Sequence, residues 1–131
     1  MSTTIRLCRG FSLLELLIVV CLVGIITSIA VPSLRNHVRK TNRVAAQSYM
    51  LDTIARQEQS LLDVRQYFTG TTQVPPPTDV RAHFAITVDA DNAATPPTCL
   101  VTAAPVRDQA VDGGTMTLDC VGNKTPISMW Q

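Results

Sequence analysis

The chain has 131 residues and a formal net charge of +1, which limits it to about one domain and gives no general reason to expect nucleic acid or an acidic partner. Its first quarter is too apolar for an ordinary soluble core. Of its four cysteines, only the distal pair, Cys99 and Cys120, falls where a disulfide would stabilise a folded domain, and such a pair indicates a compartment outside the cytoplasm.

The segment 11–31 is uncharged apart from one carboxylate, Glu15. At the helical rise it spans about 31 Å, the thickness of a bilayer core, so we predict a transmembrane helix. Basic residues flank both ends, and the positive-inside rule therefore does not decide the orientation. Beyond the segment, Arg35, Arg39 and Arg43 share a helical stripe, for which a solvated face is favoured over contact with lipid headgroups, acidic partners or DNA phosphates.

Two interpretations account for Glu15. Ser12 and Glu15 have the spacing of a capping box, which would open the helix. Alternatively, cleavage between Gly10 and Phe11 would create an amino group one turn from Glu15, and the two charges would pair within one chain or between packed helices. A carboxylate in a membrane segment is costly, ~2.5–3.5 kcal/mol for Asp at the helix centre, and this cost favours the ion pair. The two interpretations are compatible.

A basic leader that ends at Gly10, followed by FSLLEL from Phe11 onward and an apolar helix, resembles the class III signal of type IV prepilins and pseudopilins. The resemblance implies that residues 1–10 are a leader removed after Gly10 by a prepilin peptidase, and that Phe11 is then N-methylated. It implies that Glu15 pairs with the terminal amine of a neighbouring subunit and is an assembly determinant. It also implies an inner-membrane protein with a periplasmic C-terminal domain, which later enters an extracellular pilus.

Pro32 follows the apolar run and lacks an amide donor, so together with Gly24 it predicts weak points at which the helix kinks without ending. In pilins a proline at this place marks a bend. The segment 32–69 is predicted to carry the amphipathic helix of the globular domain, to about Val64. The predicted apolar stripe consists of Val44, Leu51, Ala55 and Leu62, widened by Ile54 and Leu61, with Asp52, Arg56 and Asp63 on the opposite side.

The segment 70–131 is predicted to hold a proline-rich loop to Asp79, a small antiparallel sheet and a C-terminal tail. Three strands are predicted, over 83–88, 98–104 and 115–121. The fold class is therefore α+β, and with the resemblance above it is pilin-like: a long N-terminal helix packed on a three-stranded antiparallel sheet.

The second and third predicted strands have one register that aligns their apolar faces. It pairs Ala103 with Met116 and Val101 with Leu118. The same register places Cys99 opposite Cys120, where a non-hydrogen-bonded pair would come near disulfide range. We therefore predict a disulfide between these two cysteines.

The C-terminal half also resembles PilE-like minor pilins, through its Arg-Gln-Glu run from Arg56, the GTMTLD stretch from Gly114 and the near-terminal Trp130. Many such relatives have cysteines where this chain has Gly113 and Met129. This departure puts the usual closure of the C-terminal loop in doubt, with Cys99 and Cys120 as its replacement, and the tail 121–131 is expected to be less firmly anchored than in those relatives.

The sequence offers little that indicates catalysis or metal binding. His37 and His83 lie far apart, without ligands at metal-binding spacing. Asp89 and Asp91 lack the further oxygen ligands of a calcium loop, so an ordinary turn is favoured. We expect no enzyme, no cofactor and no metal site.

The resemblance thus implies a PilE-like minor pilin that primes pilus assembly in or near the tip complex and serves functions such as twitching motility. Its implied partners are other pilin subunits, the prepilin peptidase, the inner membrane before assembly and a large pilus-tip adhesin. The alternatives are a type II secretion pseudopilin, a membrane-tethered enzyme and a pilin-anchored DNA-binding module for DNA uptake. The distal domain carries only sparse basic residues, Arg81, Arg107 and Lys124, so nucleic acid is not an expected partner.

Overall fold

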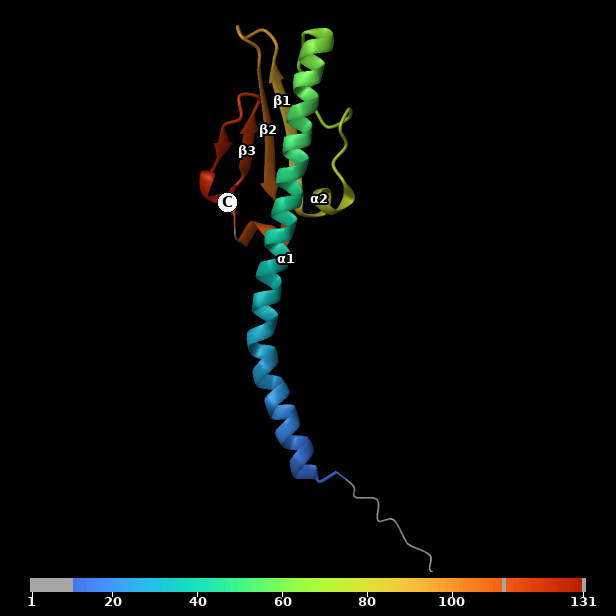
Figure 1. Cartoon of the computed structure of the whole chain (residues 1–131), viewed down its shortest axis with the longest axis vertical. Helices are drawn as coiled ribbons and strands as arrows, with labels where there is room; N and C mark the ends of the chain where they lie inside the picture. Colours follow the sequence, from blue (N-terminus) through green and yellow to red (C-terminus); the bar gives the residue numbers. More distant parts are fainter. Residues whose placement is uncertain (1–10, 112, 131) are drawn as a thin grey trace, which may run out of the picture. The chain divides into compact units, whose positions relative to one another are not determined.

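The computed structural model of the chain describes residues 11–111 and 113–130. The chain divides into two compact units, one ending at His37 and one beginning at Val38, and helix α1 (Leu13–Val64) contributes to both (Figure 1). The predicted leader 1–10, including Gly10, lies outside the described residues.

In the first unit, α1 carries a span that is long and apolar enough to cross a membrane. Its most apolar window has a mean hydropathy of 2.7, and none of that window is buried. Two hydroxyls in the span are satisfied within the helix: Thr27 donates to the carbonyl of Val23 and Ser28 to that of Ile25, each at 2.7 Å. The helix also runs through Pro32 without ending. The surface of this span is therefore apolar, and its hydroxyl donors need no outside partner.

The second unit packs the later half of α1 against a sheet of four antiparallel strands in the order β1-β2-β3-β4 (Figure 1). The strands are β1 (Phe84–Asp91), β2 (Thr98–Pro105), β3 (Met116–Asp119) and β4 (Lys124–Thr125). The predicted α+β pilin-like class is confirmed, but the predicted count of three strands is wrong. β4 was missed because two residues are too few to show an alternating pattern.

Three short helices were not predicted. Helix α2 (Thr78–His83) follows the three prolines, and the 3-10 helices η1 (Arg107–Val111) and η2 (Ile127–Met129) flank β3 and β4 in sequence. Pro77 is the N-cap of α2, and its carbonyl accepts the amide of Arg81 at 2.9 Å, which closes the first turn. The three prolines were predicted to lie in a loop that extends to Asp79. The last of them, Pro77, also starts a helix.

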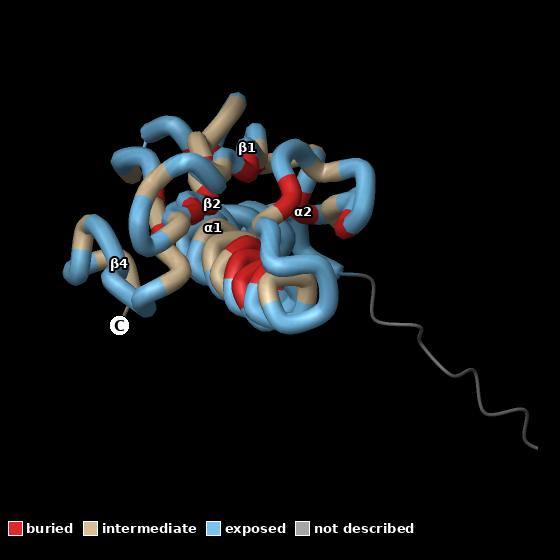
Figure 2. Tube along the Cα trace, turned by 90° about the horizontal axis from the view of Figure 1, so that it is seen from above, coloured by how far each residue is buried: buried red, intermediate tan, exposed pale blue. Residues whose placement is uncertain are grey.

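The core lies between one face of α1 and one face of the sheet, and Figure 2 shows the buried residues gathered on one side of α1. Its buried apolar members are Ala46, Tyr49, Met50, Ile54, Phe68, Val74, Val80, Phe84, Val88, Cys99, Val101, Ala103, Met116 and Leu118. All of them belong to the second unit. A fragment that begins near Val38 therefore keeps the whole described core, and we expect it to fold without the membrane span.

The predicted apolar stripe of α1 is wrong. Val44 and Leu51 are about half exposed and Leu62 is 84% exposed, whereas the buried face follows Ala46, Met50, Thr53 and Gln57. Apart from Ile54 and the partly buried Leu61, the predicted stripe is exposed. Two polar residues, Thr53 and Gln57, occupy the buried face, so a count of apolar positions does not find it. The helix does end at Val64, as predicted: Arg65 takes the left-handed conformation with φ 59°.

The predicted strand register is confirmed. Ala103 pairs with Met116 and Val101 with Leu118, and all four side chains are buried against the helix. The predicted disulfide between Cys99 and Cys120 is present, with the two Cα atoms 5.4 Å apart. One detail is corrected: the amide of Cys120 donates to the carbonyl of Cys99 at 3.2 Å, so this is a hydrogen-bonded pair, as the Cα separation also indicates.

Removal of this disulfide is expected to lower the free energy of unfolding of the second unit by about 3 kcal/mol, because the bond closes a loop with a sequence separation of 21 residues in the unfolded chain. Urea unfolding of a fragment from Val38 onward, with and without the double change Cys99→Ala and Cys120→Ala, measures this loss. A difference below about 1 kcal/mol would contradict a stabilising role.

Candidate functional site

The first candidate site is the start of α1. The Phe11 side chain is 77% exposed, and Glu15 is exposed one turn later. The carbonyl of Ser12 accepts the amides of Glu15 at 3.0 Å and Leu16 at 3.2 Å, which opens the helix by backbone bonds alone. Among the described residues, neither the Ser12 hydroxyl nor the Glu15 carboxylate makes the capping-box bond. The carboxylate therefore remains open to a partner outside this part of the chain.

The second candidate site is a corner of the second unit where α1 meets the C-terminal tail. Arg43 Nη2 lies 3.7 Å from the point where a Cβ on Gly113 would sit, and the Met129 side chain lies 3.0 Å from that same point. Next to Met129, the ammonium of Lys124 lies 5.1 Å from the centre of the Trp130 ring. We call Arg43, Lys124 and Trp130 the basic corner.

The tail that forms this corner is held in place. Strand β4 pairs with β3, and the amide of Gln47 on α1 donates to the carbonyl of Met129 at 2.5 Å. Most side chains of the described tail are nevertheless exposed, and the expectation that it is less firmly anchored than in the relatives stays a prediction. Non-covalent contacts to α1 and β3 fix this segment where Gly113 and Met129 replace the expected cysteines.

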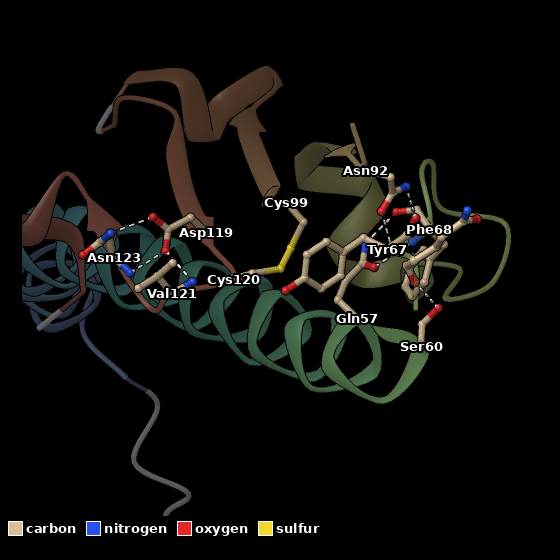
Figure 3. The surroundings of a disulfide bond; sticks show 11 residues. Gln57, Ser60, Tyr67, Phe68, Asn92, Cys99, Asp119, Cys120, Val121 and Asn123 are labelled. Carbon is tan, nitrogen blue, oxygen red and sulfur yellow. Dashed lines mark hydrogen bonds between the residues drawn. A yellow bond between two sulfur atoms is a disulfide. The ribbon is translucent and has the colours of Figure 1, made fainter. Parts of the chain in front are cut away.

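A carboxylate orders the turn between β3 and β4. Asp119 accepts the backbone amides of Val121 at 3.0 Å and Asn123 at 2.7 Å, and its second oxygen accepts the side-chain amide of Asn123 (Figure 3). Burial would raise the pKa of Asp119, but these hydrogen bonds and a further one from Gly122 lower the pKa below its ordinary value. The ionised form therefore favours the turn that presents Lys124.

Two side-chain amides hold the segment that follows α1. Gln57, fully buried on α1, donates to the carbonyl of Phe68 at 2.6 Å and accepts its amide at 2.9 Å. Asn92, in the β1–β2 connection, makes the same pair of bonds with Tyr67, at 2.9 and 2.8 Å (Figure 3). Each side-chain amide thus satisfies both the backbone amide and the backbone carbonyl of one residue, as a neighbouring β-strand would. Sequence reasoning missed them, although the helical spacing of Gln57 from Thr53 and Ala46 was a signal that could have found one.

Other candidate residues are not brought together into a site. Asp91 caps its turn by accepting the amides of Ala93 and Ala94, at 2.9 and 3.2 Å. His83 Nδ1 lies 3.7 Å from an oxygen of Asp108, which joins α2 to η1. No group of three or more metal-ligating side chains occurs within residues 11–111 and 113–130.

Comparisons with known proteins concern both candidate sites. Residues 32–122 match the family model described as "Type IV minor pilin ComP, DNA uptake sequence receptor", and residues 5–31 match that of the "Prokaryotic N-terminal methylation motif". A solved type IV pilin from Shewanella oneidensis is similar in fold, with a TM-score of 0.54 and 18% identity over 67% of this chain and 91% of that chain. No curated protein sequence matches the chain.

Proposed function

The chain belongs to the family of the type IV minor pilin ComP, and we propose that it is a minor pilus subunit that binds DNA during DNA uptake. The observation that carries the DNA-binding proposal is the family match over 32–122, which covers most of the second unit. The sequence alone favours priming of pilus assembly and does not predict nucleic acid as a partner. The family description favours DNA binding over priming of pilus assembly, and it also weighs against a type II secretion pseudopilin. Priming, with a tip adhesin as partner, stays a prediction from the resemblance.

For assembly, we propose that the prepilin peptidase cleaves after Gly10 and that the new amino terminus of Phe11 is methylated. The matched methylation motif over 5–31 and the exposed apolar surface of α1 support this. The helix then anchors the subunit in the inner membrane, with the second unit in the periplasm, where the disulfide of Cys99 and Cys120 is stable. On assembly the helix leaves the lipid for the filament, where Glu15 pairs with the amine of a neighbouring subunit and Gly24 and Pro32 allow a kink.

For DNA binding, we propose that the basic corner supplies phosphate contacts. Acidic residues slightly outnumber basic ones after Val38, so attraction to DNA must come from a local arrangement rather than from the net charge. Arg43 and Lys124 come from elements far apart in sequence, yet both adjoin the segment Met129–Trp130. Cations held in fixed positions fix the register of a protein on the duplex, and neighbouring groups then read the bases.

Binding of duplex DNA to the fragment from Arg35 onward tests this function. The logarithm of the binding constant should fall linearly with the logarithm of the salt concentration, since phosphate contacts release counterions. The double change Arg43→Gln and Lys124→Gln should weaken binding for all sequences and reduce the salt slope by about 1 per lost phosphate contact. Fluorescence anisotropy with labelled DNA measures both effects.

The control for that experiment is Arg81→Gln, which removes a cation of α2 away from the basic corner and should leave the slope unchanged. No binding at low salt would contradict the DNA-binding function. If the salt slope falls with Arg81→Gln but not with the double change, the protein binds DNA through α2 and not through the basic corner.

A further inference from the structure

A pocket lies between the last turns of α1 and the segment that leads to α2. It has a volume of about 320 Å³, near the lower end of the range for small-molecule sites. Its polar lining comes from Arg56, Gln59, Ser60 and Asp63 on α1 and from Gln73 across from them, and its apolar lining from Val64, Phe68 and Val74. The size suits one ring of a small molecule, and the basic corner contributes nothing to the lining.

The apolar part of this pocket is fixed by bonds that leave its polar groups available. Tyr49 donates its hydroxyl to the carbonyl of Val74 at 2.6 Å, and the buried Gln57 holds Phe68. Ser60 donates to the carbonyl of Gln66 at 2.8 Å, beside the segment that Gln57 and Asn92 clamp (Figure 3). The buried Phe68 and Val74 are therefore in place before a ligand binds, and the ordering cost of binding falls on the exposed polar side chains.

The free polar groups have a mixed character. Arg56 is held by Asp52 through its Nε at 3.0 Å, which leaves its terminal nitrogens as donors. Within the described residues, the side chains of Gln59, Asp63 and Gln73 make no hydrogen bond, so each amide offers a donor and an acceptor and the carboxylate offers acceptors. The charges of Arg56 and Asp63 balance within the lining, and Asp52 lies close by. A phosphate is therefore disfavoured, and a neutral ligand rich in hydroxyl groups is favoured.

The spacing of the polar lining groups favours a sugar ring over a nucleobase. Arg56, Gln59 and Asp63 follow one helix face over about 10 Å at the helical rise, whereas a nucleobase presents its polar edge in one plane. A sugar ring carries hydroxyls around its whole circumference, each both donor and acceptor, and apolar C–H faces that fit Val64 and Phe68. We propose that this pocket binds a neutral sugar residue. The site is separate from DNA binding and goes beyond the proposed function.

Saturation-transfer NMR on the full chain tests this proposal, in phosphocholine micelles whose headgroup carries no sugar. The probes are glucose, galactose and N-acetylglucosamine, compared with deoxyguanosine, thymidine and methyl phosphate. At least one neutral sugar should bind saturably with a dissociation constant of roughly 1–10 mM, as expected for so small a ligand. Asp63→Ala and Gln73→Ala should each weaken that binding about tenfold by removing a hydrogen-bonding group.

The matched control is Glu58→Ala, which removes a carboxylate from the same helix outside the lining and should leave the affinity unchanged. No saturable binding by any of the three sugars would overturn the proposal. So would sugar binding that both pocket variants leave intact, or tighter binding of a deoxynucleoside that those variants abolish. Duplex binding by Gln73→Ala, which leaves the charge unchanged, is measured alongside and should equal that of the unchanged chain, so failure of the sugar site and failure of DNA binding are distinguishable.

Discussion

Replacement of Glu15 by alanine is expected to prevent the subunit from entering the filament while cleavage after Gly10 and methylation of Phe11 continue. Glu15 has no ion pair or hydrogen bond with another side chain in the described part of α1, and it lies in a surface of exposed apolar residues. In the assembly proposed above, helices pack around Glu15 and the terminal amine of a neighbouring subunit is its counterion. Loss of one partner from a buried pair costs about 3–5 kcal/mol, which reduces incorporation roughly 100-fold or more per subunit.

The measurement separates processing from assembly. Intact mass of the membrane-bound protein should show loss of residues 1–10 and one added methyl group in both the variant and the unchanged chain. Sheared pili should contain the unchanged chain and almost none of the Glu15→Ala variant. Glu58→Ala, which removes a carboxylate from the second unit, is the control and should assemble normally. If Glu15→Ala enters the pili as well as the unchanged chain, Glu15 has no role in assembly and the prediction is wrong.

Much of this fold is local enough to be predicted from sequence. The apolar span around Glu15 follows from length and composition alone. The β2–β3 register follows from a period of two, because a slip of one residue would expose Val101 and Leu118 and separate Cys99 from Cys120. The apolar span depends only on residues close in sequence. The strand pairing has one register that both buries the apolar side chains and brings the two cysteines together.

What could not be predicted depends on contacts between distant segments. The buried face of α1 includes Thr53 and Gln57, and Gln57 is satisfied only because Phe68 comes back along the helix. A count of apolar positions treats such residues as exposed, so it selected Val44 and Leu62 instead. The basic corner was missed for the same reason: Arg43 on α1 and Lys124 on β4 both come to lie beside the segment Met129–Trp130 only in the folded chain.

Gln57→Leu is expected to lower the free energy of unfolding of the second unit by about 3–5 kcal/mol. Leucine has a similar volume, so the change chiefly removes the two hydrogen bonds to Phe68. The buried backbone amide and carbonyl of Phe68 are then unpaired, and each unpaired group costs about 1–3 kcal/mol of stability. These two groups together account for the expected range, and they lie in the segment 65–77, which Gln57 anchors and which forms one wall of the pocket. Urea unfolding with linear extrapolation measures the change.

Asn92→Ala is the matched control for that change, because Asn92 makes the same two bonds with Tyr67 at an exposed position. Water can replace an exposed amide partner, so this variant should cost about 1 kcal/mol or less. Equal losses for the two variants would mean that burial is not what makes the Gln57 bonds important. A larger loss for Gln57→Leu would show that a buried amide on α1 is a stabilising contact between the helix and the segment leading to α2.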